Sequence, residues 1–266
     1  MPALRHAAVA GLFYPAETAA LRQLVARELD EADRPPAPPP KLLIVPHAGY
    51  AYSGPVAATA YALLRPDGGG PRPEIERVVL LGPAHRLAVR GLAAPKVHAF
   101  ATPLGNVALD TAALAELEVL PQIVRSDEPH ALEHSLEVQL PFLQAALDGD
   151  FVLVPLLVGN ATAEAVAQVL EVLWGDARTL IVISSDLSHY LPYALAQNVD
   201  HATAERILAF DSGLSPHEAC GSAAINGALL AARRHGLSPR LLDLRNSGDT
   251  AGDTARVVGY GAFAFS

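Results

Sequence analysis

The sequence predicts a single α/β domain whose central sheet is mostly parallel or mixed and is flanked by helices. The apolar runs LLIV, VVLL, FVLVPLLV and LIVI lack polar alternation, which is typical of strands that are buried on both faces. Segments with helical periodicity separate these runs, and such alternation favours βαβ crossovers in a parallel sheet. A length of 266 residues favours one large domain over two small ones.

The predicted elements follow one another along the chain in this alternating order. Strands are expected at the short apolar runs 41–46, 77–82, 91–95, 121–125, 151–158, 179–184, 239–244 and 256–265. Helices are expected where apolar residues recur three or four positions apart, at 21–32, 54–65, 111–118, 133–147, 162–174, 197–209 and 221–235. Pro155 cannot donate to a neighbouring strand, so it predicts an edge strand or a bulge. Pro141 predicts a kink or a fresh helix start.

Two segments interrupt the alternation. The prolines of RPPAPPP (34–40) predict an extended linker within the domain, and DGGGP (67–71) predicts a flexible turn. The chain contains no GxGxxG and no GxxxxGK[ST] string. The motifs that commonly indicate NAD or ATP binding are therefore missing.

Composition and charge restrict the partners and the compartment. Hydrophobic residues make up 51% of the chain and charged residues 18%, which favours a large core over disorder. The net charge of −9 and the lack of clustered Lys and Arg argue against nucleic-acid binding. No apolar run approaches the roughly 20 residues of a membrane-spanning helix, and the apolar run near the start is short for a signal peptide. The single cysteine, Cys220, fits a reducing compartment, so we expect a cytoplasmic protein without a membrane partner.

Histidines follow three of the predicted strands. His47 ends the run KLLIVPH, His85 ends RVVLLGPAH, and Asp186 and His189 follow TLIVIS. One histidine at such a place is more often an ordinary loop residue than a functional one. Because ligands bind outside the carboxyl ends of parallel strands, three such endings together predict a shared metal or acid–base site.

Two further residues are candidates for the same crevice. His134 begins the predicted helix 133–147, where a helix dipole favours glutamates but not a histidine, so we expect it to line the crevice. Cys220 immediately precedes the predicted helix 221–235. A lone cysteine is usually a small buried hydrophobe, but a helix N-terminus lowers the pKa of a thiol and favours a metal-binding thiolate. The sequence leaves both roles of the cysteine open.

Ordered motifs along nearly the whole chain resemble those of one known family. The motifs are the start AGLFYP, then PHAGYAYSG, LGPAH, TPLG, EHSLEVQLPFLQ, VPLLVG, SSDLSHY, ACG and the closing GYGAF. They resemble the Memo family, whose bacterial members are often called AmmeMemoRadiSam system protein B. The resemblance implies a fold similar to the class III extradiol dioxygenases, which are non-haem iron enzymes that open catechol rings. It also implies a genomic partnership with a radical-SAM enzyme and an AMMECR-type protein.

The resemblance further implies a set of site residues. In Memo proteins two histidines and a cysteine form the site, and these correspond to His47, His85 and Cys220. Asp186 and His189 match the neighbouring Asp–His pair of the family. After the cysteine this chain reads GSAAING where the animal protein is closer to GRHPIG, so any function of that Arg-His pair does not carry over.

Three functions are compatible with these residues. The leading hypothesis is a metal-dependent, dioxygenase-like redox protein that acts on an unknown small molecule with iron or copper, or with zinc. The alternatives are a non-catalytic module that binds a ligand or phosphopeptide in the same crevice, and a metal-assisted hydrolase. A serine hydrolase is less well supported because no GxSxG motif is present. The expected metal ligands are His47, His85 and Cys220, and the expected acid–base residues are His189, Asp186 and His134.

Overall fold

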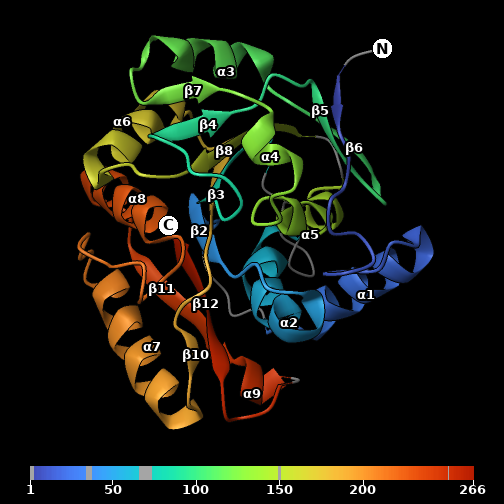
Figure 1. Ribbon diagram of the computed structural model, residues 1–266, viewed down its shortest axis with the longest axis vertical. Helices are drawn as coiled ribbons and strands as arrows, with labels where there is room; N and C mark the ends of the chain where they lie inside the picture. The colour runs from blue at the N-terminus through green and yellow to red at the C-terminus, as the bar shows by residue number, and fades with distance from the viewer. Residues whose placement is uncertain (1–2, 34–37, 66–73, 149–150, 251) are drawn as a thin grey trace.

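The computed structural model describes residues 3–33, 38–65, 74–148, 151–250 and 252–266 (Figure 1). Its strands are β1 (Leu4–Arg5), β2 (Leu42–Val45), β3 (Arg77–Pro83), β4 (Leu92–Ala94), β5 (Ala99–Thr102), β6 (Gly105–Ala108), β7 (Ile123–Arg125), β8 (Val152–Val158), β9 (Thr179–Ser184), β10 (His189–Leu191), β11 (Pro239–Asn246) and β12 (Val257–Phe265). Its α-helices are α1 (Thr18–Glu31), α2 (Tyr50–Tyr61), α3 (Thr111–Glu116), α4 (Glu128–Ala131), α5 (Leu140–Ala146), α6 (Ala163–Leu173), α7 (Tyr193–Leu208), α8 (Ser222–Arg234) and α9 (Ser247–Thr250). Three 3₁₀ turns accompany them, η1 (Ala62–Leu64), η2 (Leu117–Val119) and η3 (Glu137–Gln139).

The central sheet is mixed, as predicted. Its strand order is β10-β12-β2-β9-β3-β8-β4-β7, and β11 pairs with β12. The four middle strands β2, β9, β3 and β8 run parallel, whereas β12 is antiparallel to β2 and β4 is antiparallel to β8. Figure 1 shows α6, α7 and α8 on one side of the sheet and α1, α2 and α5 on the other. Because helices cover both faces, β2 and β9 are buried along their whole length.

Pro155 does not mark a sheet edge or a bulge, contrary to the sequence prediction. It pairs in regular register with Leu80 of β3, and β8 has β4 on its other side. The pairing with β4 begins only at Leu157, and on the same side Leu153 makes an isolated bridge with Leu109. The proline therefore lies where no strand requires its missing N–H, which explains why an interior strand tolerates it.

The prediction of one helix over residues 133–147 is also wrong, because the first half of this segment does not form an α-helix. The chain forms α4, a turn, η3 and then α5, with Pro141 in the first turn of α5. The carboxylate of Glu133 accepts hydrogen bonds from the amides of His134 and Ser135, which stabilises a turn at this point instead of a helix. A proline lacks an N–H and suits a first turn, so the helix begins afresh at Leu140.

Other differences are smaller. Helices α2 and α7 each begin four residues before their predicted starts. In α2, Gly54 and Pro55 resemble a helix start, but the helix carries them in its interior. The small sheet β1-β5-β6, the strand β10 and the short helices α4 and α9 were not predicted. Part of the proline linker 34–40 and the whole turn 67–71 lie outside the described residues. Among the residues described, no helix has the length and apolarity needed to cross a membrane.

Candidate metal centre

Three neighbouring strand ends bring the predicted residues to one edge of the sheet. His47 follows β2, His85 follows β3, and Asp186 follows β9, which lies between these two strands. Since the three strands are parallel, their carboxyl ends open on the same side. His47 is almost completely buried, with 1% of its surface exposed.

A third histidine joins the first two. His47, His85 and His134 each offer a ring nitrogen, and these atoms all lie within 4.8 Å of one another. The centroids of the rings are 4.9 to 5.4 Å apart. The sequence assigned His134 to acid–base work, but the structure places it among the possible metal ligands. Its predicted position in the crevice is therefore observed, although it comes from a turn and not from a helix.

Gly82 allows the turn with His134 to approach the end of β3. A Cβ atom at Gly82 would lie 2.9 Å from Leu136 Cδ2 and 3.0 Å from Ser135 Oγ, so a larger residue would push the turn away. The Ser135 hydroxyl also donates to the carbonyl of Pro83 over 2.8 Å. Glycine at this position therefore lets the turn that carries His134 pack closely against the end of β3.

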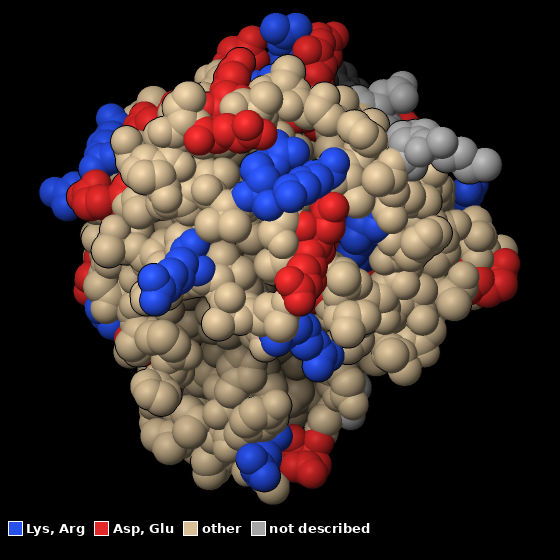
Figure 2. Space-filling model, turned by 45° about the horizontal axis from the view of Figure 1, so that its top comes forward, with Lys and Arg blue, Asp and Glu red and all other residues tan. Residues whose placement is uncertain are grey.

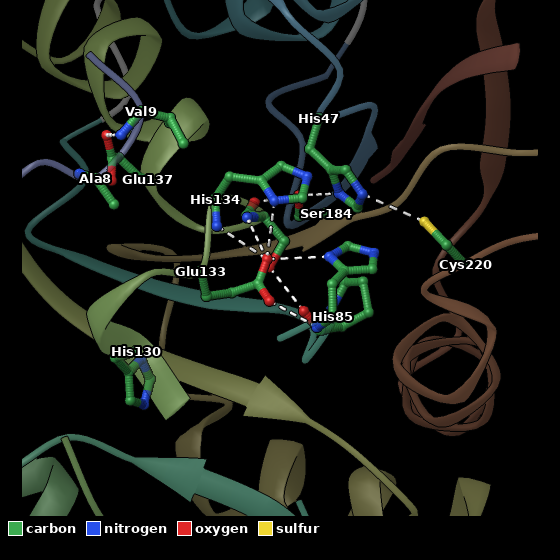
Figure 3. A network of polar contacts seen from close by, with 12 residues as sticks. Ala8, Val9, His47, His85, His130, Glu133, His134, Glu137, Ser184 and Cys220 are labelled. Carbon is green, nitrogen blue, oxygen red and sulfur yellow. Dashed lines mark hydrogen bonds and ion pairs between the residues drawn. The ribbon is translucent and has the colours of Figure 1, made fainter. Parts of the chain in front are cut away.

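The Glu133 carboxylate lies at the centre of the cluster (Figure 3). Its Oε1 accepts from His85 Nδ1 over 3.0 Å, and its Oε2 accepts from the His85 amide over 2.6 Å. His134 Nδ1 lies 3.2 Å from the same Oε1, although without hydrogen-bond alignment. An ionised carboxylate can only accept, so His85 carries its proton on Nδ1. The ring nitrogen that remains for a ligand is then Nε2 in His85, and in His134 it is the nitrogen turned away from Glu133.

The pKa of Glu133 results from opposing effects. Burial favours the neutral acid and would raise the pKa, but contacts with His134 and His85 and the hydrogen bond from the Ser135 amide stabilise the charged form more strongly. The pKa therefore lies well below its usual range. Glu133 is consequently an anion that can hold two imidazoles in place at neutral pH.

A hydroxyl network fixes the tautomer of His47. Ser184 Oγ donates its proton to the carbonyl of Ser135 over 2.6 Å and lies 2.8 Å from His47 Nδ1. Having given its proton away, Ser184 must accept from an N–H on His47 Nδ1. Gln139 Nε2 also donates to Ser184, and Tyr61 donates to Gln139 Oε1, which sets the orientation of that amide. The Nε2 of His47 therefore carries a lone pair, which can accept a hydrogen bond or bind a metal ion.

The pKa of His47 lies well below its usual value. Burial is the main cause, and the neighbouring rings of His85 and His134 lower it further. His47 is therefore neutral at physiological pH, which is the protonation state that a metal requires.

Cys220 lies beside the cluster. Its Sγ is 3.3 Å from His47 Nε2, and Figure 3 shows the sulfur on the side of His47 away from His134. Burial, followed by the nearby charge of Asp186, raises the pKa of the thiol to about 12. The sequence suggested that the helix N-terminus would lower this pKa. Burial of the thiol outweighs the helix dipole in the metal-free protein.

Asp186 and His189 have different hydrogen-bond partners. Asp186 is buried, burial raises its pKa, and its Oδ1 accepts the main-chain amide of His47 over 2.7 Å. It therefore positions the His47 loop and not an imidazole ring. His189 Nδ1 lies 2.9 Å from the carbonyl of Leu187, which can only accept, so in the neutral ring Nε2 has the free lone pair.

A cavity of about 520 Å³ adjoins the three imidazoles. Its polar lining includes Asp186 and His189, and its aromatic lining residues are Phe13, Tyr52, Tyr190 and Tyr260. Tyr190 has a φ of 60°, a left-handed conformation that few residues other than glycine adopt. Sequence reasoning gave no role to Glu133, Gln139, Ser184 or Tyr190, although each lies within a quoted motif.

The chain is similar to known proteins over nearly its whole length. A family model described as "Memo-like protein" matches residues 5–264. A MEMO1 family protein of Methanopyrus kandleri is 37% identical over 286 residues and covers 98% of both chains, and one of Aeropyrum pernix is 36% identical over 97% of this chain and 98% of its own. The crystal structure of uncharacterized protein JW3007 from Escherichia coli K12 is 14% identical, with a TM-score of 0.51 over 84% of this chain and 98% of that one, which shows a likeness of fold alone. With a family match over nearly its whole length and relatives above 30% identity, the chain belongs to the Memo family.

Proposed function

We propose that the protein binds a transition metal ion through His47, His85 and His134 and acts as a redox protein on a small molecule in the adjacent cavity. The observation that carries the proposal is the convergence of three imidazoles whose other ring nitrogens face Ser184 or Glu133. Ligand histidines in metalloproteins are typically held in this way, because the partner fixes the tautomer and the ring orientation. The donor set therefore fits a metal ion.

Iron or copper is the proposed metal, and zinc is the third possibility. Imidazole nitrogen suits all three ions. The sulfur of Cys220 lies close enough to His47 Nε2 to add a softer donor, which would favour copper. When bound, the ion would supply Lewis acidity and, if it is iron or copper, electron transfer.

The protein's own residues have separate tasks in this proposal. His189 would accept a proton from the substrate through Nε2. In the neutral ring this nitrogen carries the lone pair, and the residue lines the cavity. Asp186 keeps the His47 loop in place through the main-chain amide. The aromatic walls of Phe13, Tyr52 and Tyr260 exclude water and favour a flat, partly apolar substrate.

Elemental analysis of anaerobically purified protein tests the proposal. The parent protein should retain close to one equivalent of metal, and His134→Ala should lose it. The matched control is His201→Ala, because His201 is an exposed histidine of α7 whose ring Nδ1 lies 2.7 Å from the carbonyl of Gln197. Metal that remains bound in His134→Ala would contradict the three-histidine ligand set. A parent protein that takes up no metal would contradict the proposal and favour a non-catalytic binding module.

Metal-assisted hydrolysis is the second candidate function. A three-histidine donor set with an open position is typical of zinc sites that activate water, and His189 offers a base beside it. The two functions differ in the metal and in its redox behaviour. Bound zinc together with turnover of ester or amide substrates would support hydrolysis, whereas iron or copper that changes oxidation state in electron paramagnetic resonance would support the redox function.

We also propose a cytoplasmic location and a partnership with a radical-SAM enzyme and an AMMECR-type protein. The single cysteine supports the compartment, and the name of the bacterial family members supports the partnership. Co-purification of a tagged protein from its own host, under anaerobic conditions, tests the partnership. Recovery of neither protein would contradict it.

A further inference from the structure

A second cavity lies beside the candidate metal centre. Its volume is about 320 Å³, and it shares His85 with the larger cavity. The sulfur-bearing residue Cys220 and the first turn of α8 line it on one side, and apolar residues such as Pro83, Ala88 and Val158 line it on the other. No aspartate or glutamate is among its lining residues, although the chain has a net charge of −9. Figure 2 shows acidic and basic side chains interspersed over the face of the molecule that it draws.

The first turn of α8 presents amides without acceptors to this cavity. The amide of Ser222 donates to Ala219, and that of Ile225 donates to Gly221. Within the described part of the chain, no acceptor is found for the amides of Ala223 and Ala224, and the N-cap residue Gly221 has no side chain that could supply one. Both alanines line the cavity. Two N–H groups and the positive end of a 13-residue helix therefore face the same space.

The hydroxyl of Ser222 provides an independent observation. Ser222 is 96% buried, since only 4% of its surface is exposed, and it lines the cavity. Its Oγ makes no hydrogen bond with any described residue. The oxygen is not among the fully enclosed polar atoms that lack a partner, so a ligand in the cavity can reach it and gain a hydrogen bond that no described residue takes.

We propose that this cavity binds a small organic carboxylate. Its oxygens would accept from the amides of Ala223 and Ala224 and from the Ser222 hydroxyl, and its short apolar part would lie along Pro83 and Val158. A helix N-terminus carries about half a positive charge, which suits a single negative charge. The lining contains no lysine or arginine that would balance a phosphate dianion. This inference does not rest on metal binding.

Nuclear magnetic resonance on the metal-free protein tests the proposal without any variant. Butyrate is the probe, and butyramide is the control of the same shape without the charge. Butyrate should shift the amide signals of Ala223 and Ala224 and bind at least roughly tenfold more tightly than butyramide. Inorganic phosphate should bind more weakly than butyrate. Equal binding of the two organic probes, tighter binding of phosphate, or butyrate shifts confined to the larger cavity would overturn the proposal.

A charge placed at the site sharpens this test. Ala223→Asp puts a carboxylate in the first turn of α8, where it suits the helix dipole but competes with the ligand. Butyrate affinity should fall at least roughly tenfold, and Ser222→Ala should lower it by a few fold. The control is Ala112→Asp, which makes the same charge change at the exposed second residue of α3. Unchanged affinity in a folded Ala223→Asp protein, or an equal loss in the control, would overturn the proposal, whereas metal uptake should be the same in all of these proteins.

Discussion

Glu133 and Glu137 lie four residues apart in one segment, and both are buried, with exposed fractions of 2% and 0%. Each carboxylate is surrounded by donors. Around Glu137 these are Arg5, the amides of Ala8 and Val9, and the Tyr14 hydroxyl. Around Glu133 the donors come from His85, His134 and Ser135. The two environments nevertheless differ in whether the donors keep a nitrogen that can bind a ligand.

The Glu137 environment is closed. Arg5 also donates to the carbonyls of His130 and Glu133, so the guanidinium is held on several sides. Burial, and then the charge of Glu137, raise the pKa of Tyr14 well above its usual range, which keeps the phenol protonated as a donor. The residues of this network are not among those that line the cavity beside the three imidazoles. Glu137 therefore ties the N-terminal segment to the segment with the histidines.

The Glu133 environment is open on one side. Its donors are imidazoles, and an imidazole that donates from one nitrogen still has a second nitrogen for a ligand. The same residue type in the same segment is thus structural in one case and positions possible metal ligands in the other. The difference lies in the partners, and each prediction below tests one side of it.

Glu137→Ala should have the largest effect on folding. It leaves the buried Arg5 without its carboxylate, and such a change costs about 3–5 kcal/mol. The free energy of unfolding, measured with urea at neutral pH, should fall by that amount. A loss as small as that of a surface ion pair, below about 1 kcal/mol, would mean that the network is not a structural clamp.

His130, whose carbonyl accepts from Arg5 of the Glu137 network, should make the free energy of unfolding depend on pH. Burial lowers its pKa to about 4, from an ordinary value near 6.5. Between these values the unfolded chain binds a proton that the folded protein does not, so stability falls as the pH drops from about 6.5 to about 4. The contribution is about 3 kcal/mol. His130→Gln cannot titrate, and the difference in unfolding free energy between parent and variant should change by that amount over this range; a constant difference would refute the assignment.

Glu133→Gln should affect the metal more than the fold. The amide cannot accept from both imidazoles and the turn amides as the carboxylate does, so the rings lose their fixed orientation. Metal affinity should fall about 10–100-fold, as is typical when the partner of a ligand histidine is changed. Competition with a chelator measures this, with Glu137→Gln as the matched variant. An equal loss in both variants would show that the two glutamates do not differ in the proposed way.

Cys220→Ser should have the smallest effect and depend on the metal. The sulfur contacts only one ring of the cluster, so binding of Fe(II) should change by less than about tenfold. Cu(I) prefers soft donors and should be weakened more. If the serine variant bound Cu(I) as tightly as the parent, Cys220 would not belong to the ligand set.

The sequence predicts the sheet and the position of the crevice because both depend on local patterns. Continuous apolar runs identify β2, β3, β8 and β9, and their carboxyl ends locate His47, His85 and Asp186. The turn at Glu133 was not predicted, because it depends on a carboxylate that is satisfied by residues far along the chain, such as His85. The sequence left two roles open for Cys220, and which effect controls its pKa could not be decided from the sequence for the same reason. Local position suggests a helix dipole, but burial is decided by the tertiary structure.

X-ray absorption spectroscopy of the metal-loaded protein tests the central claim most directly. The claim is that His47, His85 and His134 bind the ion together. The spectrum should show three imidazole nitrogens at about 2.0–2.1 Å, and one imidazole fewer in His134→Ala. A spectrum with two imidazoles and a sulfur at about 2.3 Å, unchanged in His134→Ala, would contradict the claim and identify Cys220 as the third ligand.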